Sequence, residues 1–383
     1  MKISKMAGKI APSLTRKLFN MAQKYDNVID LTLGDPDMPA PEKIKKAACD
    51  AIDDDMTRYS ANAGLLPVRE SVSNRVNKIW GVNSSVDNVM LTVGGMEALY
   101  LSLLCTVEEG DEVIIFAPYY VNYVQMVAMC GGKPIIIDAY GKNGFEIDRR
   151  KLLEKITEKT VAVIINSPNN PTGDVLSEDF LKSVYEVASE KDLYIISDEV
   201  YRTLTYDSVI PKSVLKFSGA AERTILVDSM SKEYSMTGWR IGYAWANAQL
   251  IKEMIKMQEN IAACVSLPSQ YAMLYAYEND VDNGYIVEEF EKRRNFLYNR
   301  ILKIEKLHCI KPKGTFYMFV NIKETGLNSE EFAERLLLEK QVAVVPGIAY
   351  GKKYDSYIRI AFTKNISILA EATCRIYDFV RTI

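Results

Sequence analysis

The sequence predicts an α/β fold: a large domain whose mostly parallel central sheet carries helices on both faces, joined to a smaller α+β domain. Short, β-branched apolar runs recur through the middle of the chain, and amphipathic stretches with helical spacing separate them. Strands that are buried on both faces have this nearly continuous apolar character. Alternation of such strands with helices is typical of a parallel sheet. Near residue 283 the pattern changes, which indicates the second domain.

Five apolar runs are predicted as strands of the central sheet, namely residues 113–116, 134–137, 161–165, 194–196 and 224–227. Residues 177–190 are predicted as an amphipathic helix, because Leu181, Val184 and Ala188 share one face and Ser177 is a suitable N-cap. Residues 97–107 are predicted as a mostly buried helix that follows Gly94 and Gly95.

The last hundred residues follow a different order of elements. The predicted elements are strands over 316–320, 342–345 and 357–362 and helices over 328–339 and 365–380. A long polar helix over 283–306 is predicted to connect the two parts. We therefore expect a large domain over residues 45–285 and a smaller domain built from residues 1–44 and 286–383.

Composition excludes several classes of partner. The 383 residues include 47 Lys and Arg and 50 Asp and Glu, which gives a net charge of −3. Proteins that bind nucleic acid or acidic membrane surfaces usually carry a basic surplus. No run approaches the ~20 apolar residues of a membrane span, and no apolar signal core follows the first residues. We expect a cytoplasmic protein with neither nucleic acid nor membrane as partner.

Composition also limits the chemistry. The chain has a single histidine, His308, so a multi-histidine metal site is impossible and a histidine-based triad would have to use that residue. The six cysteines show no C-x-x-C spacing, and no metal site is expected. Neither a G-x-G-x-x-G dinucleotide motif nor a P-loop is present. Lysine, tyrosine, carboxylates or a cofactor are left to carry the reaction.

Polar and aromatic residues gather after the predicted strands. They lie in the segments 117–120, 166–173, 197–201 and 228–232. In an open parallel sheet the carboxyl ends of the strands form the ligand site. The Gly94–Gly95 pair at a helix start adds a possible anion site, since free backbone N–H groups point outward there.

Three segments carry a resemblance to a known family. Residues 229–242, Ser-Met-Ser-Lys-Glu-Tyr-Ser-Met-Thr-Gly-Trp-Arg-Ile-Gly, resemble the lysine signature of class I aminotransferases. These belong to the fold-type I pyridoxal-phosphate enzymes and include aspartate and aromatic aminotransferases. Residues 169–173 and 197–201 are similar to two further blocks of the family, in the same order and spacing. The resemblance extends from about Gly34 to Arg359.

The resemblance implies an aminotransferase that uses pyridoxal 5'-phosphate. Lys232 would form an imine with the cofactor aldehyde and later carry the proton to and from the substrate α-carbon, which requires a lowered pKa. Asp198 would pair with the protonated pyridine nitrogen, which makes the ring an electron sink. Tyr201 and Asn170 would hydrogen-bond the ring hydroxyl, and Tyr120 would stack on the ring.

The remaining roles concern the phosphate and a second subunit. The backbone N–H groups of Gly95 and Met96 would bind the phosphate, with Ser229 adding a hydroxyl and Arg240 a charge-assisted fork. Tyr59 matches a position that reaches the phosphate of the neighbouring subunit. The resemblance therefore implies a homodimer with two shared sites.

Arg359 matches the arginine that binds the substrate α-carboxylate by a bidentate pair, and Gly34 matches the glycine that lets the backbone approach that carboxylate. The family also commonly has cis peptide bonds at the positions of Ala117–Pro118 and Asn170–Pro171. We predict that both bonds are cis, although cis occurs in only about 5–6% of X-Pro bonds.

The substrate is less well defined by the sequence. The amino donor could be aspartate, aromatic or neutral, and 2-oxoglutarate is the expected acceptor. Some aspartate-using relatives have a lysine where this chain has Met96, and others an arginine in a segment like 260–269, which has none here. Because losing a charged partner can cost roughly 2–5 kcal/mol, a neutral or aromatic donor is at least as well supported.

Two other functions stay open. One is carbon–sulfur β-elimination on the same scaffold, whose enzymes tend to carry histidine after the aspartate–glutamate pair. Here Val200 and Tyr201 follow that pair, which favours transfer. The other is a non-catalytic relative that binds pyridoxal phosphate; retention of Lys232, Asp198 and Arg359 argues against it.

Overall fold

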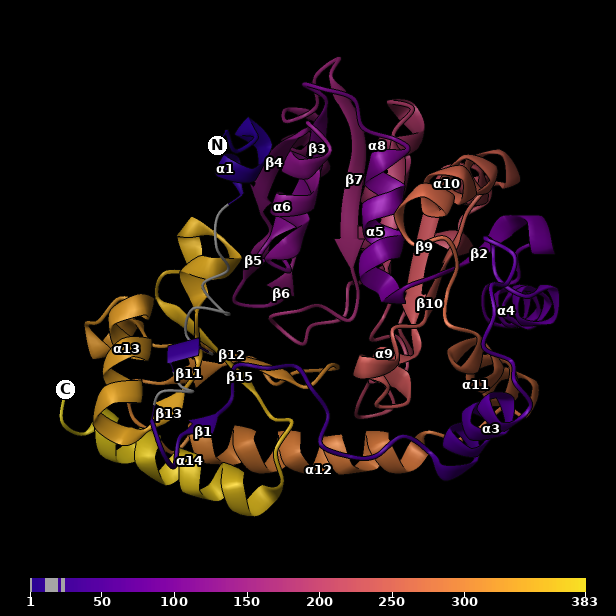
Figure 1. The fold of residues 1–383 in the computed structure, drawn as a ribbon. Coiled ribbons are helices and arrows are strands. Elements are labelled where there is room, and N and C mark those ends of the chain that lie inside the picture. The colour runs from indigo at the N-terminus through magenta and orange to yellow at the C-terminus, as the bar shows by residue number, and fades with distance from the viewer. Residues whose placement is uncertain (1, 11–19, 22–24) are drawn as a thin grey trace.

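The structure is a computed structural model that describes residues 2–10, 20–21 and 25–383. Its main feature is a seven-stranded sheet in the large upper part of the molecule (Figure 1). In order across the sheet, the strands are β2 (Val89–Thr92), β10 (Gly242–Trp245), β9 (Thr224–Ser229), β8 (Tyr194–Asp198), β7 (Thr160–Asn166), β3 (Glu112–Ala117) and β4 (Lys133–Asp138). The five predicted runs are the parallel strands β3, β4, β7, β8 and β9, so the mostly parallel sheet is confirmed.

The edge strand β2 and its neighbour β10 were not predicted. Strand β10 is antiparallel to both of its neighbours, β2 and β9. It follows β9 after a short connection that contains only the four-residue helix α9 (Met230–Glu233) and one 3-10 turn. Parallel pairing needs a crossover of a dozen or more residues, usually through a full helix. The chain turns back instead, and this turn carries Lys232.

Helices cover both faces of the sheet. Helices α5 (Gly94–Leu104), α6 (Asn122–Met129) and α10 (Ala248–Ile261) lie in front of it in Figure 1 and share one buried cluster. Helices α7 (Arg149–Leu153) and α8 (Glu178–Glu190) pack on the opposite face. The predicted cap of α8 is confirmed, because the Ser177 side chain accepts a hydrogen bond from the Phe180 N–H.

The β2 edge has its own hydrophobic cluster, formed with α3 (Glu42–Asp53), α4 (Leu66–Trp80) and α11 (Leu267–Glu278). Three short elements lie away from this edge: α1 (Lys5–Lys9), which is drawn beside β4 in Figure 1, and the hairpin of β5 (Tyr140–Gly141) and β6 (Gly144–Phe145), which follows β4. None of the helices that the structure describes has the length and apolar character needed to cross a membrane.

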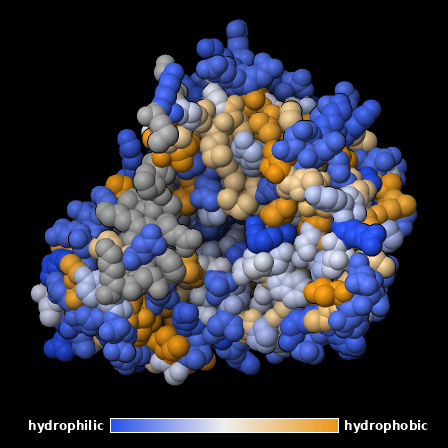
Figure 2. All heavy atoms as spheres, viewed as in Figure 1, coloured by the Kyte–Doolittle hydropathy of each residue, from blue (hydrophilic) through white to orange (hydrophobic). Residues whose placement is uncertain are grey.

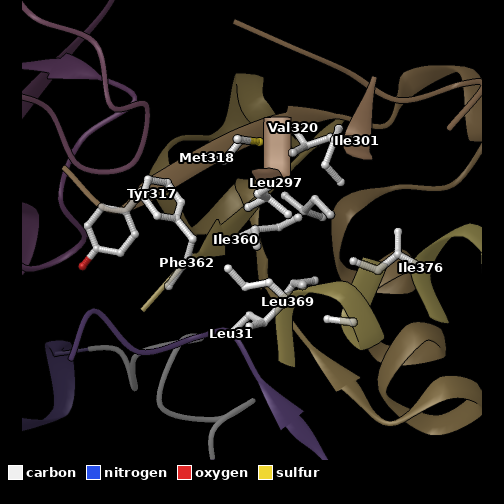
Figure 3. Close-up of a cluster of buried hydrophobic side chains, with 14 of the residues drawn as sticks. Leu31, Leu297, Ile301, Tyr317, Met318, Val320, Ile360, Phe362, Leu369 and Ile376 are labelled. Carbon is white, nitrogen blue, oxygen red and sulfur yellow. The ribbon is translucent and has the colours of Figure 1, made fainter. Parts of the chain in front are cut away.

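A smaller sheet lies below the large one. Its strands, in order, are β11 (His308–Cys309), β12 (Tyr317–Asn321), β15 (Tyr357–Ala361) and β14 (Val345–Pro346), all antiparallel. Helices α12 (Gly284–Ile301), α13 (Ser329–Lys340) and α14 (Ile366–Val380) enclose the hydrophobic cluster of Figure 3 against this sheet. In Figure 1, α12 runs along the bottom of the molecule from α3 and α11 to α14.

The predicted strand over 342–345 is wrong as a single element. Residues Val342–Ala343 form β13, which pairs in parallel with β1 (Ile29–Asp30), whereas β14 pairs with β15. Two different partners on successive residues cannot be inferred from a continuous apolar run. The pairing of β1 with β13 joins the N-terminal segment to the smaller part, and we keep the domain limits at residues 45 and 285 as a proposal.

Candidate active site

A cavity of about 1010 Å³ opens between the two sheets, at the carboxyl ends of the central parallel strands. Figure 2 shows the hollow in this face of the molecule. Eleven of the twelve residues singled out from the sequence line it: Gly34, Gly95, Met96, Tyr120, Asn170, Asp198, Tyr201, Ser229, Lys232, Arg240 and Arg359. The twelfth, Tyr59, lies outside the cavity with its side chain 88% exposed.

The amine of Lys232 projects from α9 and donates a hydrogen bond of 2.8 Å to the Gly34 carbonyl oxygen. Burial lowers its pKa from 10.5 to about 8, because the charged form loses solvation. The positive charges of Arg240 and Arg359 lower it further, whereas Asp35 opposes this effect. With this pKa, roughly a tenth of the amine is uncharged at pH 7 and about half at pH 8.

The carboxylate of Asp198 lies at the end of β8. It accepts hydrogen bonds from the Tyr123 hydroxyl at 2.5 Å and from the Val200 N–H at 3.3 Å. Burial raises its pKa to about 6, and these two hydrogen bonds partly oppose the rise because they stabilise the ionised form. Tyr123 was missed in the sequence; its position three residues after Tyr120, at the start of α6, was the only signal.

An anion site is built where β2 leads into α5. The first N–H groups of a helix lack intrahelical partners and attract anions. Gly94 has φ +72°, and a Cβ there would lie 2.6 Å from Nη2 of Arg240, so the guanidinium packs directly on the helix start. Arg240 is held by hydrogen bonds to the carbonyls of Thr237 (2.9 Å) and Val93 (3.2 Å).

Ser229 caps α9 by accepting a hydrogen bond from the Ser231 N–H at 3.1 Å. Its hydroxyl also lies 2.8 Å from the Ser231 hydroxyl and 2.9 Å from the Ile241 carbonyl. The capped turn fixes the direction of the helix that carries Lys232. The predicted contact of Ser229 with a phosphate stays a prediction.

Arg359 enters the cavity from β15 and is almost fully buried. Its Nη2 donates to the Thr32 carbonyl, and its Nη1 donates to Oδ1 of Asn170 at 3.2 Å. The buried Nε has no hydrogen-bond partner among the residues that the structure describes. Such an unsatisfied charged donor is costly, and its position on the cavity wall fits a site for an anionic substrate group.

Tyr317 was not singled out in the sequence, although its strand was. Strand β12 places Phe319 opposite Arg359, so Tyr317 lies two residues along on the same face of the sheet. Its ring centroid is 4.2 Å from the Arg359 guanidinium carbon, and its hydroxyl is 3.2 Å from that of Tyr201. A Cβ at Gly34 would lie 1.7 Å from the Tyr317 hydroxyl, so only glycine fits beside this side chain.

Tyr120 lies between the two sheets. Its hydroxyl is 3.5 Å from the sulfur of Met96 and accepts a hydrogen bond from the Asn122 side chain at 3.1 Å. Its ring packs edge-on against Tyr123, with centroids 5.5 Å apart. Burial raises its pKa, so the hydroxyl stays protonated.

The two predicted cis bonds, Ala117–Pro118 and Asn170–Pro171, are both cis, and Ser167–Pro168 is cis as well. His308 is exposed, contacts Glu324 at 3.0 Å and does not line the cavity.

The cavity thus has two walls. The large-sheet side carries Asn170, Asp198, Ser229, Lys232 and Arg240, and the small-sheet side carries Gly34, Tyr317 and Arg359. A helix start with a guanidinium, an amine of lowered pKa and a buried carboxylate together suit an aromatic aldehyde that bears a phosphate and a protonated ring nitrogen. The donor set therefore fits pyridoxal phosphate.

Comparison with known proteins agrees with this geometry. Residues 26–373 match the model of the family described as aminotransferase class I and II. The chain is 38% identical to aromatic-amino-acid aminotransferase 2 of Thermococcus litoralis, covering 96% of this chain and 95% of that protein. It is 39% identical to an aspartate aminotransferase of Pyrococcus abyssi, covering 97% and 96%.

A crystal structure of aspartate aminotransferase from Thermotoga maritima superposes with a TM-score of 0.93 at 34% identity, covering 99% of this chain and all of that one. The fold-type I architecture expected from the resemblance is confirmed. The family match covers nearly the whole chain, and the matched residues include nearly all of those that line the cavity around Lys232. This chain therefore belongs to the class I and II aminotransferases and is an amino-acid aminotransferase.

Proposed function

We propose that this aminotransferase uses pyridoxal 5'-phosphate to move the amino group of an aromatic or neutral amino acid to a 2-oxo acid. The observation that carries the proposal is the meeting of three groups on one cavity wall: the Lys232 amine, the Asp198 carboxylate and the start of α5 beside Arg240. When bound, pyridoxal phosphate would supply an aldehyde that accepts amino groups and a ring that withdraws electrons.

Lys232 would hold the cofactor and serve as the base. Because its pKa is about 8, roughly half of the amine is uncharged at pH 8, and Nζ can accept a proton from the substrate α-carbon. Positive charge nearby, from Arg240 and Arg359, favours the uncharged form before the proton arrives. The same nitrogen would then return the proton.

Asp198 would pair with the protonated ring nitrogen. Its pKa of about 6 leaves it ionised at neutral pH, and the hydrogen bond from Tyr123 stabilises that charge. Arg240 and the N–H groups of Gly95 and Met96 would bind the phosphate, and Tyr201 and Asn170 would contact the ring oxygen.

Arg359 would bind the substrate carboxylate through charge-assisted hydrogen bonding. Its Nη groups already bond Thr32 and Asn170, which fix the guanidinium plane, while Nε is left for a ligand. Gly34 would give that carboxylate access beside Tyr317.

The preference for an uncharged donor rests on the cations of the cavity wall. Among the lining residues that the structure describes, they are Lys232, Arg240 and Arg359, and each has a role above. The wall beside Met96 presents Tyr120, Asn122 and Leu99 instead, which suits an aromatic or neutral side chain. Relatives with aromatic and with aspartate specificity are both similar to this chain. We expect 2-oxoglutarate as the acceptor, as the family resemblance implies.

We also propose a cytoplasmic homodimer with shared sites. Tyr59 is a large aromatic residue that a single chain leaves almost fully exposed. The side chain of an exposed tyrosine suits a subunit contact, because its apolar ring can be buried while its hydroxyl binds a polar group. That group would be the phosphate bound by the other subunit.

The test is a donor screen on the purified protein with pyridoxal phosphate and 2-oxoglutarate. Phenylalanine, tyrosine, leucine and alanine are compared with aspartate, and glutamate, ammonia and pyruvate are measured. We expect glutamate without ammonia, with the aromatic or neutral donors giving the higher kcat/KM. A clear preference for aspartate would contradict the proposed donor class. Ammonia and pyruvate released from cysteine would indicate β-elimination instead.

A further inference from the structure

Tyr317 lies where the hydrophobic cluster of the smaller part meets the cavity. Figure 3 shows it at the margin of that cluster, with its ring directed away from Leu369 and Ile376. The residue is 3% exposed and lines the cavity. A buried tyrosine hydroxyl normally has a hydrogen-bond partner, and the partner here is another tyrosine hydroxyl rather than the backbone.

The hydroxyl contact joins Tyr317 to the large-sheet side. Tyr201 follows β8 and donates to the Tyr317 oxygen at 3.2 Å across 116 residues of sequence. Burial, followed by the neighbouring Tyr317, raises the pKa of Tyr201 well above its usual value. Tyr201 therefore keeps its proton and is available as a hydrogen-bond donor.

The ring contact joins Tyr317 to Arg359 on its own sheet. The guanidinium carbon lies 4.2 Å from the ring centroid, closer than its 5.4 Å distance from the Tyr350 ring. Contact of a buried guanidinium with an aromatic face is favourable. The ring thus supports the guanidinium from its face, while Thr32 and Asn170 fix its Nη groups.

We propose that Tyr317 is a positioning residue that couples the two walls of the cavity. Its hydroxyl sets the strength of the hydrogen bond that Tyr201 gives to the cofactor ring oxygen, and its ring holds Arg359 in the orientation that binds the substrate carboxylate. The inference rests on the proposed function, because it assigns Tyr201 to the cofactor and Arg359 to the substrate.

The direction of the hydroxyl effect follows from hydrogen-bond chemistry. A tyrosine hydroxyl has one donor and can also accept, so when Tyr201 donates its proton to a ligand oxygen, its contact with Tyr317 is kept as a hydrogen bond by rotation of the Tyr317 hydroxyl, which then donates to Tyr201. Successive hydrogen bonds polarise and strengthen one another. A stronger bond to a negative ring oxygen favours the deprotonated form and lowers the pH at which the bound chromophore titrates.

The experiment compares three variants loaded with pyridoxal phosphate. Tyr317→Phe keeps the ring and removes the hydroxyl, whereas Tyr317→Met fills a similar space without a ring. Tyr354→Phe is the matched control: it removes a buried hydroxyl that donates to the Ala117 carbonyl at 2.8 Å, and that carbonyl keeps the Ala139 N–H as a donor. Tyr354 does not line the cavity.

Two quantities are measured: the pH midpoint of the cofactor absorbance without amino donor, and the KM of the donor. For Tyr317→Phe we expect the midpoint to rise by roughly 0.5 pH unit, with KM within about twofold of wild type. For Tyr317→Met we expect the same shift and a KM about tenfold higher. The control should match wild type in both.

The outcomes separate the inference from the function on which it rests. A wild-type protein that takes up no pyridoxal phosphate would overturn both. A wild-type protein that titrates normally, with the midpoint of Tyr317→Phe unmoved, would overturn the hydroxyl role alone. An unchanged KM in folded Tyr317→Met would overturn the ring role, and an equal shift in Tyr354→Phe would attribute the effect to lost packing.

Discussion

The two walls of the cavity are held together in different ways. On the large-sheet side, many contacts join residues close in sequence: Ser229 caps the Ser231 N–H, Arg240 bonds the Thr237 carbonyl, and Asp198 accepts from Val200. On the small-sheet side, the contacts span the chain. Arg359 bonds Thr32 across 327 residues, and Gly34 accepts from Lys232 across 198.

This difference has a mechanical consequence. A wall made of strand ends and their own turns is positioned by the fold of the large sheet, whatever the smaller part does. The small-sheet side is correct only when three distant segments meet. We therefore expect the large-sheet side to govern cofactor attachment and chemistry, and the small-sheet side to govern substrate affinity.

The largest effect should come from Lys232→Ala. Without the amine the cofactor has no point of attachment and the α-proton has no base, so we expect loss of the visible cofactor absorbance and a fall in turnover of at least about 10³-fold. Lys252→Ala, which changes an exposed lysine on α10, is the control and should behave like wild type. Absorbance and turnover close to wild type in Lys232→Ala would end the assignment.

Arg359→Ala should have the second largest effect, and on the other wall. Removing the guanidinium leaves the substrate carboxylate without its charged partner, so KM should rise on the order of 100-fold. The cofactor absorbance should persist, because Lys232 and Asp198 are intact. Arg359→Lys keeps the charge without the planar guanidinium, so its KM should lie between those of wild type and Arg359→Ala. An unchanged KM would contradict the assigned role.

Tyr123→Phe should have a smaller effect that depends on pH. The variant removes the 2.5 Å hydrogen bond that stabilises ionised Asp198, so the pKa of this carboxyl should rise above about 6. Near pH 6 more of it would be protonated and unable to pair with the ring, and the cofactor Kd should rise about tenfold. At pH 8 the carboxyl is ionised in both proteins, and the defect should nearly disappear. A defect of equal size at both pH values would point to lost packing instead.

Sequence patterns predicted the strands that form β-branched, nearly continuous apolar runs. Strands β3, β7, β8 and β9 are almost entirely buried, and β4 at the sheet edge still reads as an apolar run although it is only partly buried. Strands β2 and β10 are also buried, but their four-residue sequences Val-Met-Leu-Thr and Gly-Tyr-Ala-Trp form no β-branched run. The division of residues 342–345 into β13 and β14 depends on two different partner strands. Pairing of this kind is a property of the folded chain rather than of the local sequence.

In the site, too, residues in local sequence motifs were predicted, whereas residues that act through distant contacts were not. The residues named from sequence blocks line the cavity, because each block follows a strand whose end faces it. Tyr123 and Tyr317 were missed, since each acts through a hydroxyl contact with a residue 75 or 116 positions away. Gly34 was expected to admit the substrate carboxylate. The structure adds a second reason why glycine is required at this position, because the Tyr317 hydroxyl occupies the space that a Cβ would need.

The smallest effect should come from Tyr59, which belongs to neither wall of its own chain. Because the side chain is 88% exposed, Tyr59→Phe should change the free energy of unfolding by less than about 0.5 kcal/mol. If the partner subunit uses the hydroxyl for its phosphate, the cofactor Kd should rise about fivefold, the equivalent of one hydrogen bond. Tyr377→Phe, on the exposed face of α14, is the matched control and should bind the cofactor like wild type.

Mixing variants makes this last test decisive. In a hybrid of one Lys232→Ala chain and one Tyr59→Phe chain, the site with an intact Lys232 would receive its Tyr59 from the other chain. That site should bind the cofactor with wild-type affinity, although neither parent homodimer does. If Tyr59 instead acts within its own chain, the hybrid has no intact site and its affinity stays at the Tyr59→Phe value. Only sharing between subunits predicts recovery, because both defects then fall in one site of the hybrid and the other site is intact.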